Sequence, residues 1–215
     1  MPLIPAAPTR PTPVIVNGVS GITALAASGA HTVALRGDGT VWTWGLNANG
    51  QLGDGTTAQR LTPVVVPGLT TVVAIAAGAA HTLAARSDGT VWAWGANTNG
   101  RLGDGTTTQR LSPITVANAT SVTRVAAGTY HSLALKGDGT VLAWGGNGYG
   151  QVGDGSLTDR STPVAVSGLS LVTSLAAGRL HSLARLADGT VRAWGGNGNG
   201  QLGDGSCHIA RRPWR

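Results

Sequence analysis

Histidine is the residue type in this sequence with the clearest potential for chemistry, because it recurs at a fixed step of 50 residues. The four members of this series are His31, His81, His131 and His181. If their imidazoles met at one point they could ligate a cation, with nitrogen about 2 Å from the ion. The alternative is that each histidine begins a strand after a glycine turn and donates a hydrogen bond to a neighbouring loop. We favour the structural role, because residues that begin separate repeat units are usually too far apart to share one ion.

A second candidate for chemistry is the Gly-Asp-Gly triplet, which also recurs every 50 residues, at Gly53, Gly103, Gly153 and Gly203. One aspartate per loop lacks the several spaced carboxylates that calcium requires, and turn formation explains the triplet without a metal. No Ser-His-Asp set, carboxylate pair or phosphate-binding loop stands out from the repeat background. The sequence therefore predicts no catalytic residues, no metal, no cofactor and no enzymatic activity.

The same step of 50 residues governs the whole chain, which indicates one structural unit copied in tandem. It is kept by a tryptophan series (Trp44, Trp94, Trp144, Trp194), by an asparagine series (Asn47, Asn97, Asn147, Asn197) and by the prolines that begin the units (Pro13, Pro63, Pro113, Pro163). Residues present in all four copies are more typical of a scaffold than of an active site. We expect a proline-rich tail over residues 1–12 and a divergent basic tail over residues 207–215. Between them we expect four repeats, over residues 13–62, 63–112, 113–162 and 163–206.

One unit contains four short apolar runs separated by turn residues, which predicts four antiparallel strands. In the second copy these are 64–66, 71–77, 81–86 and 90–95. The Asp88-Gly89 pair between two apolar runs predicts a tight hairpin, because both residue types accept positive φ. Four such strands make a propeller blade. We therefore predict an all-β propeller of four blades, as an open arc or a small ring; residues 13–16 would pair with the last unit if the ring closes.

The two tryptophan positions on the last strand of each unit are expected to differ in burial. We predict that Trp44, Trp94, Trp144 and Trp194 are core residues, since all four copies keep tryptophan. Two positions earlier the sequence drifts, which indicates partial exposure; the residues there are Trp42, Trp92, Leu142 and Arg192.

Composition excludes several classes of protein. The chain has 34 glycines, 10 prolines and no glutamate, which disfavours helices, and a hydrophobic fraction of 41% is sufficient for a packed core. Of the fifteen basic residues, four are arginines near the chain ends, which leaves eleven against nine aspartates. With Lys136 as the single lysine, no basic cluster forms, and we predict no nucleic-acid partner.

The apolar stretches and the single cysteine bear on membrane insertion and compartment. Residues 63–85 carry no charge, but their Pro67-Gly68 pair and Gly78 fit two strands better than a membrane helix. The first thirteen residues are not typical of a signal peptide, and a single cysteine, Cys207, gives no information on redox compartment. A cytoplasmic protein and part of a larger secreted protein both remain open.

The residues carry a resemblance to the regulator of chromosome condensation (RCC1) repeat. The string A-A-G-x-x-H-[ST]-x-A-x-x-x-D-G-T-V-x-A-W-G-x-N-x-x-G-Q-L-G-D-G stands at 76–105, with Arg101 for Gln, and at 126–155, with Val152 for Leu. The resemblance extends over residues 13–206 and implies a β-propeller; well-known members have seven blades. A plant photoreceptor of this family uses tryptophan in the Gly-x-x-His loop, and the loop at 78–81 has none.

Comparison of the four copies with one another locates the variable positions. They lie in the loop before each histidine and in the loop after each tryptophan strand, which strand alternation places on one face, opposite the Asp-Gly hairpins. On this face we predict partner-binding residues, because tyrosine and arginine are enriched in binding hot spots. They are Tyr130, Arg179, Tyr149 and Arg101. Neutral variation on exposed loops is the alternative.

Three functions follow from these observations. The first is a non-catalytic propeller that binds a protein partner through its face loops. The second, implied by the resemblance alone, is guanine-nucleotide exchange on a small GTPase, although every unit here has 50 residues and no inserted wedge. The third is a secreted inhibitor or adhesion module, since the near-identical, alanine- and glycine-rich copies resemble bacterial members.

An incomplete propeller would also permit self-association, and the divergence of residues 207–215 would fit a truncated or frameshifted gene.

Overall fold

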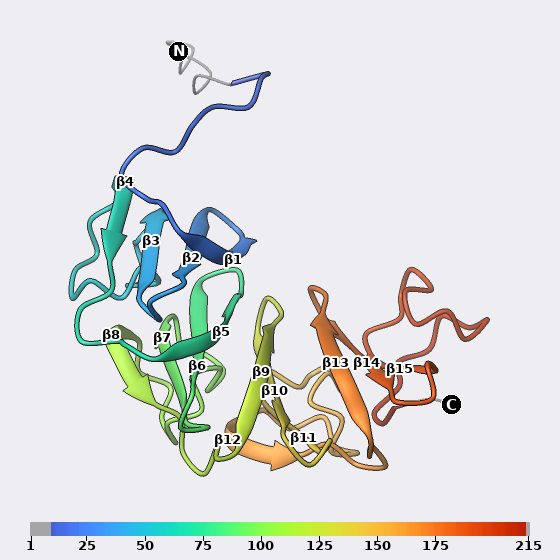
Figure 1. The fold of residues 1–215 in the computed structure, drawn as a ribbon. Coiled ribbons are helices and arrows are strands. Elements are labelled where there is room, and N and C mark those ends of the chain that lie inside the picture. Colours follow the sequence, from blue (N-terminus) through green and yellow to red (C-terminus); the bar gives the residue numbers. More distant parts are fainter. Residues whose placement is uncertain (1–9, 214–215) are drawn as a thin grey trace.

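The structure is a computed structural model that describes residues 10–213 of the chain. Fifteen β-strands and their connecting turns account for the regular structure of these residues, and none of the described residues is helical. Accordingly, no helix in the described range is long and apolar enough to cross a membrane. The strands are arranged as a curved series of small sheets (Figure 1).

Each sheet is one blade, and its strands pair antiparallel in chain order. Blade 1 contains β1 (Ile22–Ser28), β2 (His31–Arg36), β3 (Val41–Gly45) and β4 (Arg60–Val65). Blade 2 contains β5 (Val72–Ala77), β6 (His81–Arg86), β7 (Val91–Gly95) and β8 (Arg110–Thr115). Blade 3 contains β9 (Val122–Ala127), β10 (His131–Lys136), β11 (Val141–Gly145) and β12 (Arg160–Ala165). Blade 4 contains β13 (Val172–Ala177), β14 (His181–Leu186) and β15 (Val191–Gly195).

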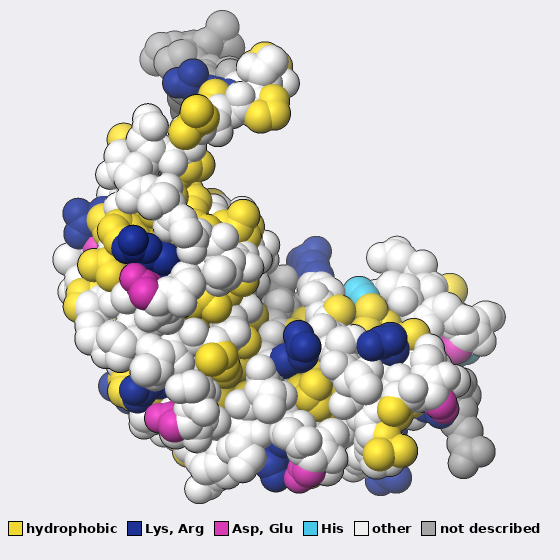
Figure 2. All heavy atoms as spheres, in the orientation of Figure 1, with side chains coloured by type: hydrophobic (Ala, Val, Ile, Leu, Met, Phe, Trp, Pro, Cys, Tyr) yellow, Lys and Arg dark blue, Asp and Glu magenta, His cyan; other side chains and the backbone are white. Residues whose placement is uncertain are grey.

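The blades are arranged around a common axis as in a propeller. The first strands of neighbouring blades contact one another along the concave side, whereas β4, β8 and β12 lie on the outer side (Figure 1). This confirms the predicted all-β propeller architecture with four blades. The ring is open, and Figure 2 shows a crescent whose two ends do not meet.

The boundaries of the blades are shifted by one strand relative to those of the predicted repeat units. Residues 64–66 were expected to begin the second blade, but Val64 and Val65 belong to β4, where they pair with Thr43 and Trp42 of blade 1. The physical cause lies in the preceding loop. An ion pair between Asp54 and Arg60 returns the chain to the edge of β3, so the apolar run completes blade 1 before the chain crosses to blade 2.

The Asp-Gly hairpins form as predicted. Gly39 has a φ of 80°, while Asp38 does not adopt positive φ, so only the glycine uses the left-handed conformation that both residue types accept. Gly39 N donates to Arg36 O, and Arg36 N donates to Thr40 O. This is a three-residue loop with a glycine bulge. The Asp38 carboxylate stabilises it by accepting hydrogen bonds from both the backbone and the hydroxyl of Thr40.

The two ends of the arc depart from the repeat. Residues 13–16 would pair with the last unit only in a closed ring; in this open arc they are exposed and form no strand. At the other end blade 4 has three strands, and its fourth is reduced to a single bridge between Gly195 and Ala210. Ala210 stands at the position of Arg60 in blade 1, so the ion pair that orders this return in the other blades cannot form.

The core lies between the blades. Trp94, Trp144 and Trp194 have no exposed surface and pack against the preceding blade, as predicted for their series. The fourth member, Trp44, was also predicted to be core but is only half-buried, because no blade precedes blade 1. The other tryptophan position is partly exposed in every copy, as expected from its drift.

Candidate functional site

The histidine series links each blade to the next through a short chain of hydrogen bonds. His31 Nε2 lies 3.0 Å from Thr82 Oγ1, Thr82 Oγ1 donates to the Gln51 carbonyl at 2.8 Å, and Trp94 Nε1 donates to the same carbonyl at 2.9 Å. Because the threonine gives its only proton to the carbonyl, His31 must donate through Nε2. The series recurs as His81–Ser132–Arg101 carbonyl–Trp144 and as His131–Ser182–Gln151 carbonyl–Trp194.

This arrangement makes the three histidines neutral structural groups. Burial lowers the pKa of His31 to about 4 and that of His131 to about 3, and it lowers the pKa of His81 well below its usual value. Each Nε2 donates a hydrogen bond to a side-chain hydroxyl of the next blade. That hydroxyl belongs to a strand residue and not, as we had expected, to a loop residue. Within residues 10–213, no three His, Cys, Asp or Glu side chains lie together as metal ligands would.

The Gly-Asp-Gly loops are organised by protein groups alone. Asn47 Nδ2 donates to Asp54 Oδ1 at 3.0 Å, and Arg60 Nε donates to Asp54 Oδ2 at 2.7 Å. Burial opposes ionisation of Asp54, but hydrogen bonds from Thr56 and Arg60 outweigh it and hold the pKa of the carboxyl below its usual value. Both carboxylate oxygens are therefore satisfied within the loop, which serves to return the chain to the blade edge.

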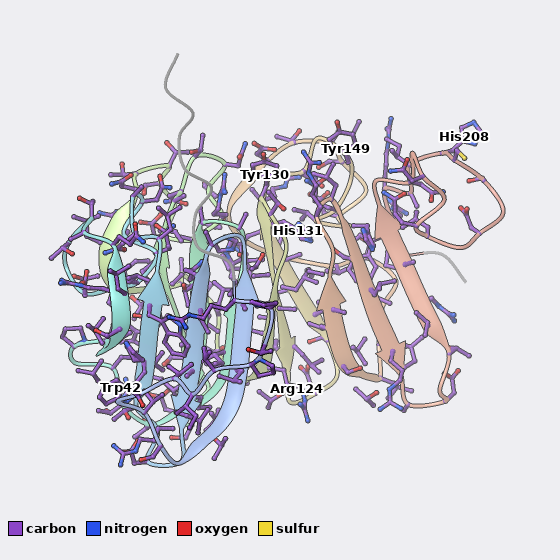
Figure 3. The ribbon with its side chains drawn as sticks, turned by 90° about the horizontal axis from the view of Figure 1, so that it is seen from above. Trp42, Arg124, Tyr130, His131, Tyr149 and His208 are labelled. Carbon is purple, nitrogen blue, oxygen red and sulfur yellow. The ribbon has the colours of Figure 1, made fainter. Side chains whose placement is uncertain are left out.

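The variable loops lie together at one end of the strands, as strand alternation predicted. Figure 3 shows Tyr130 and Tyr149 at this end, and Trp42 and Arg124 at the opposite end. The two loops of a blade are joined by the backbone, since Gly146 N donates to Tyr130 O at 2.7 Å. We call this end the loop face.

A pocket of about 280 Å³ occupies the loop face above blade 3. Tyr130 and Tyr149, the only two tyrosines of the chain, both line it, with side chains that are 38% and 49% exposed. Asn99 of the blade 2 loop, Asp159 and Leu180 complete the walls. The structure thus brings two of the four predicted residues into one hollow, with an aromatic lining, one carboxylate and one aliphatic side chain.

Arg101 was predicted as a partner-binding residue, but it is buried and supports this pocket from within. It is only 4% exposed, and its guanidinium lies 4.9 Å from the centre of the Tyr130 ring. Its nitrogens donate to the Thr129 carbonyl at 3.1 Å and to Asn99 Oδ1 at 3.0 Å. Burial lowers the pKa of Arg101, while Tyr130 and Asp159 oppose that change, and the guanidinium stays charged.

Asp159 extends the same network to the far wall of the pocket. Its Oδ2 accepts from Asn99 Nδ2 and its Oδ1 from the Asn147 backbone, both at 2.7 Å. Arg101, Asn99 and Asp159 therefore form one hydrogen-bonded series beneath the two tyrosines. Such a series fixes the pocket in one geometry before any partner arrives.

Arg179 lies on the loop face but outside this pocket. It is exposed and lines a neighbouring hollow of about 240 Å³, together with Ser28 and Thr129. Its backbone carbonyl accepts a hydrogen bond from Thr129 N at 3.3 Å, and the chain neighbours of these two residues, Tyr130 and Leu180, line the tyrosine pocket. Arg179 thus lies beside the tyrosine pocket and not within it.

Six of the eight residues that line the pocket were not predicted, among them Asn99, Asp159 and Leu180. Asn99 and Leu180 lie at positions that vary among the copies, but neither is a residue type typical of hot spots. Asp159 carried a signal that we missed, because Gln59 and Gln109 stand at its position in the first two copies. A carboxylate in place of an amide distinguishes blade 3 from blades 1 and 2 at this position.

Comparison with known proteins agrees with this architecture. Residues 5–214 match the family model described as RCC1-like domain. Human WBSCR16 is similar, with 27% identity and a TM-score of 0.80 over 90% of this chain and 52% of that one. Yeast RCC1 (Prp20), in a structure with Kap60 bound, has 26% identity and a TM-score of 0.80 over 90% of this chain and 48% of that one. Prp20p from Saccharomyces cerevisiae, studied for its binding to Gsp1p and histones, has 26% identity and a TM-score of 0.78 over 95% of this chain and 51% of that one.

The chain spans about half the length of these solved relatives. Curated protein sequences gave no match. The relatives named are human and yeast proteins, so the comparisons do not support the bacterial origin that composition suggested. The family model covers nearly the whole chain, its repeat agrees with the sequence motif, and its solved relatives share the blade geometry. The chain belongs to the RCC1-like domain family.

Proposed function

We propose that this protein is a non-catalytic binding module that holds a protein partner on its loop face. The observation that carries the proposal is the pocket between Tyr130 and Tyr149, supported from beneath by the buried Arg101. A binding surface gains affinity when its contact residues are fixed before association, because less conformational entropy is then lost.

The dimensions and chemistry of the pocket suit a protein side chain. A volume of about 280 Å³ lies at the small end of the range for small-molecule sites, and is sufficient for one or two side chains. Two half-exposed tyrosine rings supply apolar area with hydroxyl groups at the edge, which is typical of residues that dominate protein interfaces. Asp159 and Leu180 add one polar and one apolar wall, so an amphipathic side chain of the partner is favoured.

The test uses the partners of the structural relatives as probes. Prp20p is described with Gsp1p and histones, and both can be titrated against this chain. We expect the double variant Tyr130→Ala/Tyr149→Ala to lose at least tenfold in affinity for whichever probe binds, about 1.4 kcal/mol or more. Arg124→Ala, an exposed residue at the opposite end of the strands, is the matched control and should bind as the wild type does. Equal affinity of the double variant and the control would refute the site.

A second function, nucleotide exchange on a small GTPase, is favoured by one observation, the similarity to a protein studied with Gsp1p. Against it stands the uniform 50-residue unit, which provides no inserted segment to displace a nucleotide. The decisive assay is release of fluorescent GDP from Gsp1p in the presence of this chain. Accelerated release that is lost in the double variant would replace our proposal by exchange activity at the same face.

A further inference from the structure

The contact between neighbouring blades is built three times within this chain, with nearly the same residues. Each blade presents a forward face to the next blade; in blade 1 it includes Val33, Leu35 and Val41. The next blade presents a backward face; in blade 2 it includes Ala84 and Trp94. Equivalent residues form the contacts of blade 2 with blade 3 and of blade 3 with blade 4.

The two ends of the arc expose the unpaired halves of this contact. Val191 on the forward face of blade 4 is 57% exposed, although its counterparts Val41, Val91 and Val141 are buried. Leu25 on the backward face of blade 1 is 69% exposed, whereas its counterparts in the other blades are partly buried against the preceding blade. Figure 2 shows hydrophobic side chains gathered along the concave edge near both ends.

The hydrogen-bonding groups at the ends are also complementary. Blade 4 carries His181 and the Gln201 backbone, which correspond to the donor His131 and the acceptor Gln151 of the contact before it. Blade 1 carries Thr32 and Trp44, which correspond to Thr82 and Trp94. In the part of the chain that the structure describes, His181, Thr32 and Trp44 make none of these side-chain bonds, although the hydrogen-bonding groups of a fourth contact are all present.

We propose that the forward face of blade 4 binds the backward face of blade 1 of a second copy, head to tail. His181 Nε2 then donates to Thr32 Oγ1 of the other copy, while Thr32 and Trp44 donate to the Gln201 carbonyl. The occupant is a second copy because the required partner surface is the one that this chain itself carries. Such head-to-tail contacts close a ring where the rotation between copies permits and otherwise build an open series of arcs.

One residue weakens this fourth contact. Arg185 stands on the forward face of blade 4 where Leu35, Ala85 and Leu135 are buried in the other blades. Covering a guanidinium that has no ionic partner opposes association. We therefore expect wild-type association to be weak and expect Arg185→Leu, which restores the apolar set of the internal contacts, to lower the dissociation constant at least about tenfold.

The experiment is sedimentation velocity over a range of concentrations, in the Arg185→Leu background as well as the wild type. Leu25→Asp disables the backward face and Val191→Asp the forward face, and both residues are already exposed, so folding should be retained and can be checked by thermal unfolding. Each variant alone should be monomeric. Their mixture should form a heterodimer, because blade 4 of the first and blade 1 of the second still match. Leu61→Asp, exposed on the outer strand β4, is the control and should associate normally.

The outcomes separate this contact from any other. Association that is lost in each variant and regained in the mixture supports the head-to-tail contact. A chain that stays monomeric even with Arg185→Leu overturns the proposal. Association that survives in both aspartate variants also overturns the proposal. So does association that is lost in only one of the two variants, because a symmetric contact between identical faces depends on one end of the arc alone.

Discussion

At the scale of single residues, the blade contacts depend on hydroxyl groups that both accept and donate. Ser132 accepts from His81 and donates to the Arg101 carbonyl, at 3.0 and 2.8 Å. Ser132→Ala leaves the buried His81 Nε2 unpaired and removes one of the two donors to the Arg101 carbonyl, which keeps its bond from Trp144 Nε1. We expect it to lower the free energy of unfolding by about 1–3 kcal/mol. Ser132→Thr is the control and should retain stability, because Thr82 performs the same role one blade earlier. Urea denaturation measures both, and equal stability of the alanine and threonine variants would contradict the relay.

The buried histidines predict a loss of stability in acid. The pKa of His31 and His131 falls from 6.5 to about 4 and about 3 on folding, so the unfolded chain binds more protons at pH values between these limits. The free energy of unfolding therefore decreases as the pH falls below about 6.5, by up to about 1.4 kcal/mol per pH unit for each histidine. Hydrogen bonds hold the pKa of loop aspartates such as Asp54 and Asp104 below the ordinary value, so these carboxyls do not contribute between pH 6.5 and 5.

This pH dependence can be measured by urea unfolding at pH 7, 6 and 5. His131→Gln should reduce the slope of stability against pH over that interval, whatever its effect on stability at pH 7. A wild-type stability that does not change between pH 7 and 5 would show that these histidines take up protons in the folded protein as readily as in the unfolded chain, against their neutral role in the blade contacts.

At the scale of the elements, the turn between β12 and β13 holds a residue in an unfavourable conformation. Leu171 is exposed and has a φ of 56°, in the left-handed region that favours glycine; Gly21 stands at this position in the first copy. Relief of the strain is worth about 1–2 kcal/mol, and the greater freedom of glycine in the unfolded chain returns about 0.5–1 kcal/mol. Leu171→Gly should therefore stabilise the protein by up to about 1 kcal/mol.

The comparison that isolates this effect is Leu171→Ala, which removes the same side chain but keeps the strained backbone. Alanine should leave the thermal midpoint unchanged or lower it, while glycine should raise it. A glycine variant less stable than the alanine variant would mean that the conformation carries no strain.

Most strands could be predicted from the sequence, because apolar runs and turn residues are local signals. Their assignment to blades could not, since the pairing of Val64 and Val65 with β3 depends on the ion pair of Asp54 with Arg60, which closes a loop and has no mark in the run itself. The hairpin was predicted correctly but its turn type could not be, because Asp-Gly serves in both kinds of loop.

The candidate site was predictable in part for the same reason. Comparison of the copies located Tyr130 and Tyr149 on one face. It did not predict the burial of Arg101, since an arginine in a loop is usually exposed; here the Tyr130 ring and two oxygen acceptors compensate for that burial. Such compensation arises from residues of two different blades and becomes visible only when the blades are packed.

At the scale of the whole molecule, the loop face and the end faces are separate surfaces with separate roles. The loop face carries the pocket of blade 3, whose tyrosine-bearing loops lie at the ends of strands and not on the blade faces that pack together. Closing the arc through its end faces would leave the loop face accessible. We therefore expect Leu25→Asp and Val191→Asp to alter the oligomeric state without reducing the intrinsic affinity of one chain for a partner.

The most direct test of the loop-face proposal exploits the fact that the chain has only two tyrosines, both in the pocket. Labelled with fluorotyrosine, the protein should give two fluorine signals, which Tyr130→Phe and Tyr149→Phe assign. Addition of a bound partner, with Gsp1p and histones as the first probes, should shift both signals, and Arg124→Ala should leave those shifts unchanged. A partner that binds while both signals stay in place would contradict the account, because binding would then take place elsewhere on the molecule.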